Sequence, residues 1–232
     1  MNTVSFFVGM IFWITILVLT SFVLTSLWTK IFSGKTFQIL MFPGIIIHEL
    51  SHVLGCFLTG SKIEEVKFFS SKGGYVRHRK PKIPVIGMPI IGMFPVIGGI
   101  AFLFLLLNIF DFNFPETILF SGSLYKDFIE LIRSSLFFII NHWGSWKFWL
   151  FLYLTVSVLI CLIPSRQDLK NSLVGLIAIA VVLSLLINFN LFIEQVDIFI
   201  NEYLTTSLIV GVFFGIIALI ITVPIYLIKK LI

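Results

Sequence analysis

Long apolar stretches, separated by shorter polar segments, run through most of this chain. At a helical rise of about 1.5 Å per residue, six of these stretches are read as membrane-spanning helices. They cover Val4 to Trp28, Phe37 to Thr59, Ile83 to Phe110, Phe148 to Ile163, Leu173 to Phe189 and Ser207 to Ile228. The pattern predicts an all-α polytopic membrane protein with about six transmembrane helices, forming one membrane-embedded domain over residues 1–232.

Two segments depart from a plain helical pattern. Between residues 61 and 82, apolar and charged positions alternate on either side of Gly73-Gly74. Glycines allow positive φ between two extended runs, so this segment is predicted to be a β-hairpin after the second span. The third apolar stretch contains Pro89 and Pro95, which remove helical hydrogen bonds, and it is expected to be a broken or partly re-entrant span.

Composition supports the membrane assignment. The chain is 59% hydrophobic and only 12% charged, with a mean hydropathy of +1.11. A soluble domain usually carries about 25% charged residues, so a soluble globular protein is excluded. The bilayer is therefore the expected surrounding of the protein, and no nucleic-acid-binding signature is present.

The chain has a net charge of +5, and the places of its basic residues indicate how the spans are oriented in the membrane. Basic residues gather after the second span, after the fourth span and at the C-terminus, whereas Lys30 and Lys35 fall in the loop between the first two spans. With six spans, the positive-inside rule places the hairpin and both termini in the cytoplasm and these two lysines on the opposite side. The protein is thus expected to be a multi-pass protein of the cell membrane.

A short polar run stands inside the second span: His48-Glu49-Leu50-Ser51-His52. On a helix, positions i and i+4 differ by about 40° in azimuth and about 6 Å in height, so both imidazoles can bind one ion. Catalytic Zn²⁺ accepts such nitrogens together with a third protein ligand and a water. Glu49 is then placed as the base that takes the proton of that water. The alternatives are a buried histidine pair with a structural glutamate, and a structural or transport metal site.

The third zinc ligand must come from another part of the chain. Cys56 lies about 12 Å along the helix from His48, which is too far for one ion. Asp168 follows the break at Pro164, near the predicted start of the fifth span, and is the better candidate, although it can also be read as an ordinary aspartate in the first turn of a helix. Weaker candidates fall on the far side of the membrane by the charge argument: Glu194, Asp197 and Glu202. His78 and His142 are expected to be solvated loop residues, with His78 also able to face the site.

The helix that carries the two histidines, called the zinc helix below, and the hairpin after it resemble the site-2 protease family of intramembrane zinc metalloproteases. The likeness lies in the run from Pro43 to His52, in Leu58 to Ile63 and in Gly73-Gly74-Tyr75-Val76, and it is closest to the small prokaryotic branch. It covers roughly Phe37 to Gly99 and, more loosely, Leu162 to Asp168, where the family's asparagine and the glycine after its aspartate are missing.

The resemblance implies a function. His48, His52 and Asp168 (helix 37–59 and region 162–170) would bind zinc, and Glu49 would be the catalytic base. The substrate would be a membrane-anchored protein that is cut within or beside the bilayer. In this interpretation an extended substrate segment could add to the strand edge at Tyr75 to His78, although the hairpin could equally cap the cytoplasmic end of the helix.

Two other functions use the same motif. One is a membrane-anchored zinc protease whose catalytic helix lies in the cytosol, but the apolar flanks of the motif argue against it. The other is a non-proteolytic membrane scaffold or metal carrier that retains the zinc helix.

Overall fold

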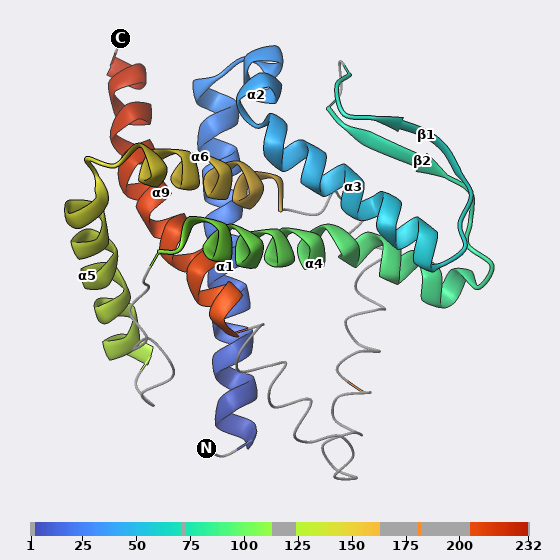
Figure 1. Ribbon diagram of the computed structural model, residues 1–232, viewed down its shortest axis with the longest axis horizontal. Helices are drawn as coiled ribbons and strands as arrows, with labels where there is room; N and C mark the ends of the chain where they lie inside the picture. The colour runs from blue at the N-terminus through green and yellow to red at the C-terminus, as the bar shows by residue number, and fades with distance from the viewer. Residues whose placement is uncertain (1–2, 71–72, 113–123, 163–180, 182–204, 232) are drawn as a thin grey trace.

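The structure of the chain is a computed structural model that describes residues 3–70, 73–112, 124–162, 181 and 205–231. Seven helices and one pair of strands organise this part of the chain (Figure 1). Their bounds are α1 Thr3–Ile31, α2 Gly34–Leu40, α3 Phe42–Leu58, β1 Ile63–Lys67, β2 Tyr75–His78, α4 Pro84–Phe110, α5 Leu124–His142, α6 Trp146–Cys161 and α9 Thr205–Leu231. The predicted all-α class with one small hairpin is confirmed.

Helices α3, α4 and α6 pack against one another and form one group, and α1 and α9 form another. In Figure 1, α4 and α6 run across the steep pair α1 and α9, and the hairpin lies beside α3. Buried side chains of α1, α6 and α9 meet in a common core that includes Leu24, Phe151, Leu159 and Phe214. The group that contains α3 is therefore held on a support of packed apolar helices.

The β-hairpin lies where the alternating pattern places it. Helix α3 ends at Leu58, and Gly60 follows with φ 65°, the left-handed conformation that commonly ends a helix. Strands β1 and β2 pair antiparallel, with Val66 opposite Val76 and Lys67 opposite Tyr75. The predictions of the helix end and of the hairpin are confirmed.

The tip of the hairpin is fixed against α2 and the start of the zinc helix. The Gln38 side-chain amide donates to the Ser70 carbonyl over 2.9 Å, and the rings of Phe42 and Phe69 stack with centroids 5.9 Å apart. The hairpin therefore folds back along α3 and does not project away from it.

The second predicted span is not one straight helix. It bends by 79° between α2 and α3, at Met41. Pro43 lies in the first turn of α3, where a helix tolerates the missing N–H. The N–H of Gly44 donates to Ser157 Oγ of α6 over 2.8 Å, so a neighbouring helix satisfies the new N-terminus. The expectation of one continuous helix over residues 37–59 was wrong for this reason.

The third predicted span, in contrast, is one continuous helix. Helix α4 continues without interruption from Pro84 to Phe110 and contains both Pro89 and Pro95. The expectation of a broken or re-entrant segment was wrong, because packing against α3 and α6 keeps the helix intact around these prolines.

The prediction of about six transmembrane helices is not supported. Within the described residues, α4 and the segment Gly211–Leu231 of α9 are long and apolar enough to cross a bilayer, and the bent pair α2–α3 makes a third if it counts as one span. Thr15–Ile31 and Trp146–Cys161 are shorter apolar helices. The predicted fifth span, Leu173 to Phe189, lies almost wholly outside the described residues.

Helices α1 and α9 pack parallel to each other. Contacts advance in the same direction along both: Thr20 lies against Gly215, Trp28 donates to Thr222, and the Lys229 amine donates to the Lys30 carbonyl. Figure 1 shows the start of α1 and the end of α9 at opposite ends of this pair. This packing places Lys30 beside the C-terminal lysines, against the expectation that they lie on opposite sides.

Candidate metal site

The polar run of the zinc helix lies on the buried face of α3. Glu49 is 6% exposed and His52 is 8% exposed, whereas Leu54 and Phe57 on the opposite face are 55% and 81% exposed. The four-residue spacing of the histidines therefore turns both imidazoles toward α4 and α6. Their ring centroids are 5.0 Å apart.

A backbone carbonyl at the end of α6 orients His48. The Nδ1 atom of His48 lies 2.6 Å from the Cys161 carbonyl oxygen. The last carbonyls of a helix have no intrahelical donor, so they accept from side chains. On α6 the neighbouring carbonyls of Leu159 and Ile160 accept from Ser21 and Thr25 of α1. The C-terminal turn of α6 is thus held between α1 and the zinc helix.

A second backbone carbonyl orients His52. The Nδ1 atom of His52 lies 3.0 Å from the carbonyl oxygen of Ile91 on α4. The two helices approach closely here, because a Cβ on Gly55 would lie only 3.1 Å from the Ile91 Cα. Small residues at such contacts are typical of helix pairs in membranes.

Both histidines fit a zinc ion. A carbonyl oxygen can only accept, so each Nδ1 carries the proton, and the neutral ring then has its lone pair on Nε2, the form that binds a metal. Two imidazoles bound to one tetrahedral Zn²⁺ have ring centroids about 5 Å apart. The observed separation of 5.0 Å agrees with this value.

Glu49 lies beneath the glycine turn of the hairpin. A Cβ added to Gly74 would be 2.7 Å from Glu49 Oε1 and 2.9 Å from its Cγ. Only a residue without a side chain lets the hairpin backbone come this close to the carboxylate. The sequence predicted Gly74 as a turn residue, whereas the structure also places it directly against the proposed base.

The structure brings together His48, Glu49 and His52. The predicted third ligand, Asp168, lies outside the described residues, as do Glu194, Asp197 and Glu202. Among the residues that are described, no group of three histidine, cysteine or acidic side chains is arranged to hold a metal ion. The assignment of Asp168 therefore stays a prediction.

The remaining histidines lie elsewhere. His78 Nδ1 is 3.2 Å from Ser61 Oγ at the base of the hairpin. His142 packs against Phe138, with ring centroids 4.2 Å apart, and its Nδ1 donates to the Phe138 carbonyl. The expectation of loop residues was wrong for both: His78 is the last residue of β2, and His142 is the last residue of α5, where its ring lies among aromatic side chains. Cys56 is fully buried.

The outer surface of the hairpin carries paired charges. Arg79 Nε donates to Glu64 Oε1 over 2.8 Å, which lowers the pKa of Glu64. The Lys67 amine, 2.7 Å from Glu65, lowers the pKa of Glu65, while the pKa of Lys67 itself is raised. These pairs are complete at neutral pH and are lost as pH falls through the lowered carboxyl pKa values.

Sequence reasoning missed the residues that orient the two imidazoles. The Cys161 carbonyl is available to His48 because α6 ends at this residue. The sequence predicted that this helix would end two residues later, at Ile163. The carbonyl of Ile91 has a visible signal in the sequence, because Pro95 stands four residues later and offers it no N–H. Neither signal shows by itself which side chain will use the carbonyl.

Comparisons with protein-family models, with curated proteins and with solved structures found no match to this chain.

Proposed function

We propose that this chain is an intramembrane zinc metalloendopeptidase that cleaves membrane-anchored proteins. The observation that supports this most directly is the pair of imidazoles on α3, each oriented through Nδ1 by a backbone carbonyl and separated as two ligands of one Zn²⁺ would be. Oriented ligands next to a buried glutamate are typical of a hydrolytic metal centre. The likeness of the sequence to site-2 proteases supports the same conclusion.

We assign the roles of the residues as the motif and the resemblance imply. His48 and His52 bind the metal, and Asp168 completes the ligand set. The Cys161 carbonyl contacts His48, and Asp168 follows Leu162 by six residues, at most roughly 20 Å of extended chain, so its carboxylate is within reach. Bound zinc would acidify a water molecule and polarise the scissile carbonyl. Glu49 accepts the proton of that water and passes it to the leaving nitrogen.

We infer a membrane orientation other than the one that the charge pattern predicted. Lys30, Lys229 and Lys230 gather where α1 and α9 end, and Gln38 ties the tip of the basic hairpin to α2, which directly follows α1. By the positive-inside rule this end of the molecule is cytoplasmic, and the N-terminus lies on the opposite side of the cell membrane. Water reaches the metal site from the side of the hairpin.

The test of the function is cleavage of a membrane-anchored substrate, co-reconstituted with the protein in lipid vesicles, with and without the Glu49 carboxylate. A metal carrier or scaffold that retains the zinc helix would bind zinc in this assay and cleave nothing.

Replacing Gly74 with alanine is expected to lower cleavage by up to about 10²-fold, because the new methyl group displaces the Glu49 carboxylate, and a misplacement near 1 Å has an effect of this size. Zinc content should not change, since Glu49 is not a ligand. Cleavage rate and zinc per protein are measured on the same sample.

Gly73→Ala is the matched control. It strains the same turn through φ 102° but meets no atom within 4 Å. An equal loss in both variants would assign the effect to the turn and contradict the contact with Glu49.

Val76→Pro is expected to lower cleavage of substrates long enough to pair with β2, because proline removes a backbone N–H from this strand. Val76→Ala retains that N–H and should cleave as the wild type does. Undiminished cleavage by Val76→Pro would count against strand addition and favour a hairpin that only covers α3.

A further inference from the structure

Pro95 interrupts the backbone hydrogen bonding of α4 at the point where this helix faces His52. In an α-helix each carbonyl accepts from the N–H four residues later, and proline has no N–H to offer. The Ile91 carbonyl therefore receives no donor from position 95. It receives His52 Nδ1 instead, over 3.0 Å, and both residues are buried.

The packing of α3 on α4 holds these groups in place. Gly55 lies one turn after His52 and touches the backbone at Ile91, and Gly98 lies one turn after Pro95 and touches Ser51. A side chain at either glycine would separate the two helices. These two close approaches, of Gly55 to the Ile91 backbone and of Gly98 to the Ser51 side chain, hold α3 and α4 together next to His52.

We propose that Pro95 is a positioning residue for the metal site, an inference that rests on the proposed zinc function. By supplying no N–H, Pro95 keeps the Ile91 carbonyl available for His52, which fixes the proton on Nδ1 and the lone pair on Nε2. Any other residue at position 95 introduces an N–H that competes for the same oxygen. The imidazole then loses its fixed tautomer and orientation, and zinc is bound less tightly.

Pro89 in the same helix is the matched control. It deprives the Val85 carbonyl of its donor in the same way, but Val85 is 75% exposed and lies in the first turn of α4. Restoring an N–H at position 89 should therefore leave the metal site unaffected.

The experiment compares wild type with Pro95→Ala, Pro95→Val and Pro89→Ala. Zinc affinity is measured by competition with a chelator, and the His52 tautomer is read by ¹⁵N NMR on metal-free protein, with His52→Gln to assign the signal. We expect both Pro95 variants to bind zinc about 10- to 100-fold more weakly and to lose the pure Nδ1–H tautomer. Pro89→Ala should match the wild type in both measurements.

The possible results distinguish the positioning role of Pro95 from the proposed zinc function. Equal zinc affinity and an unchanged tautomer in both Pro95 variants would overturn it. A loss in the valine variant alone would also overturn it, because side-chain size and not the N–H would then be responsible. If the wild type bound no zinc, the proposed function would fail, while the tautomer in metal-free protein would still test the bond to Ile91.

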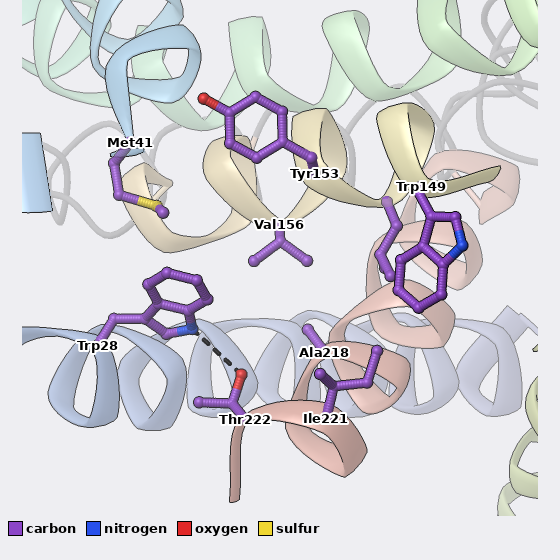
Figure 2. Close-up of a pocket in the computed structure, with 9 residues that line it drawn as sticks. Trp28, Met41, Trp149, Tyr153, Val156, Ala218, Ile221 and Thr222 are labelled. Atoms are coloured by element: carbon purple, nitrogen blue, oxygen red, sulfur yellow. Dashed lines mark hydrogen bonds between the residues drawn. The ribbon is translucent and has the colours of Figure 1, made fainter. Parts of the chain in front are cut away.

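A second, independent observation is a cavity of about 170 Å³ between α1, the α2–α3 junction, α6 and α9 (Figure 2). Aromatic rings and aliphatic side chains line it, among them Trp28, Trp149, Tyr153, Met41, Val156 and Ala218. The histidines of α3 are not among the residues that line it.

The polar groups of the Trp28, Tyr153 and Trp149 rings all donate hydrogen bonds within the protein. Trp28 Nε1 donates to Thr222 Oγ1, the Tyr153 hydroxyl donates to the Leu40 carbonyl, and Trp149 Nε1 donates to the Trp143 carbonyl. The walls consequently present ring faces and aliphatic groups. Such a surface favours an apolar chain over a polar ligand.

Basic residues follow the cavity lining at one end. Beyond Trp28 in α1 and beyond Thr222 in α9, the two helices contain Lys30, Lys229 and Lys230 and no aspartate or glutamate. Lys30 follows Trp28 by two residues, and Lys229 follows Thr222 by seven, about 10 Å of helix. Lysines thus lie beyond the end of the cavity where Trp28 meets Thr222.

We infer that this groove binds one acyl chain of an anionic phospholipid, whose phosphate lies near these lysines. An apolar cavity of about 150 Å³ accepts a molecule of the size of benzene, so 170 Å³ accommodates several methylene groups of one chain. Basic residues near the membrane surface attract anionic lipids in the same way.

Tryptophan fluorescence in vesicles tests this inference without reference to catalysis. Phosphatidylglycerol with brominated chains should quench the wild type more strongly than brominated phosphatidylcholine at equal mole fraction. Ala218→Phe fills the groove and should remove this excess, whereas Ile220→Phe, 40% exposed on the same helix, should retain it. Lys30→Gln/Lys230→Gln should reduce the excess, and Lys126→Gln on α5 should not.

Equal quenching of the wild type by both lipids would overturn the anionic assignment. Excess quenching that persists in Ala218→Phe would overturn the groove as the site. Trp28→Phe/Trp149→Phe removes the neighbouring reporters without filling the cavity, so an excess that persists in this variant would assign the lipid contact to the other tryptophans.

Discussion

Cleavage of a membrane-anchored substrate is expected to fall by about 10²- to 10⁴-fold when Glu49 is replaced by glutamine. The amide has nearly the same size and fits beneath Gly74, but it cannot accept a proton from water. Zinc content should stay at the wild-type value, because His48 and His52 keep their carbonyl partners. The measurement is single-turnover cleavage in vesicles, with zinc determined on the same preparation.

Glu130→Gln on α5 is the control for this substitution, since Glu130 lies on the surface and pairs only loosely with Arg133, at 3.8 Å. Equal cleavage by the wild type and by Glu49→Gln would show that Glu49 is not the catalytic base. Zinc bound by both proteins with cleavage by neither would instead support a metal carrier or scaffold.

The second large effect is expected on metal binding. Asp168→Asn should lower zinc from about one ion per chain to a small fraction of that value, because an amide cannot replace an anionic ligand of a catalytic zinc site. Activity should fall with the metal. Metal analysis after dialysis against a weak chelator measures the loss directly.

Asp111→Asn provides the matched control. Asp111 ends α4 with φ 51°, a conformation that asparagine adopts as readily, so the substitution removes a charge without straining the backbone. Full zinc occupancy in Asp168→Asn would refute the ligand assignment. Glu194→Gln, Asp197→Asn and Glu202→Gln would then be compared in the same way to find the third ligand.

Local features of the chain could be predicted from the sequence because each depends on a few neighbouring residues. The histidines of α3 share one face because they are four positions apart. The zinc helix ends before Gly60 because glycine adopts positive φ at little cost, and a hairpin forms where alternating residues flank Gly73. Helical geometry and backbone sterics are sufficient for these predictions.

Predictions that concern long segments were less successful. Proline signals pointed to a break in α4, where the helix is continuous, and no break was expected at Met41, where the chain bends by 79°. In both places a backbone group without a partner in its own helix is satisfied by another helix. The Ile91 carbonyl, which Pro95 leaves without a donor, accepts from His52 of α3. The Gly44 N–H, at the new start of α3, donates to the Ser157 hydroxyl of α6. Local sequence contains no information on these partners.

The sequence by itself determined the local parts of this protein: an apolar chain, the His48-Glu49-Leu50-Ser51-His52 run with both histidines on one helix face, and a glycine turn shortly after it. The tertiary structure alone decided how these parts meet. It placed Gly74 on Glu49, aimed two backbone carbonyls at the two imidazoles, and packed α1 parallel to α9, with Lys30 beside Lys229. The physical reason is that helix periodicity fixes which side chains share a face, whereas partners distant in sequence are selected by packing and by hydrogen bonds that must be satisfied in an apolar interior.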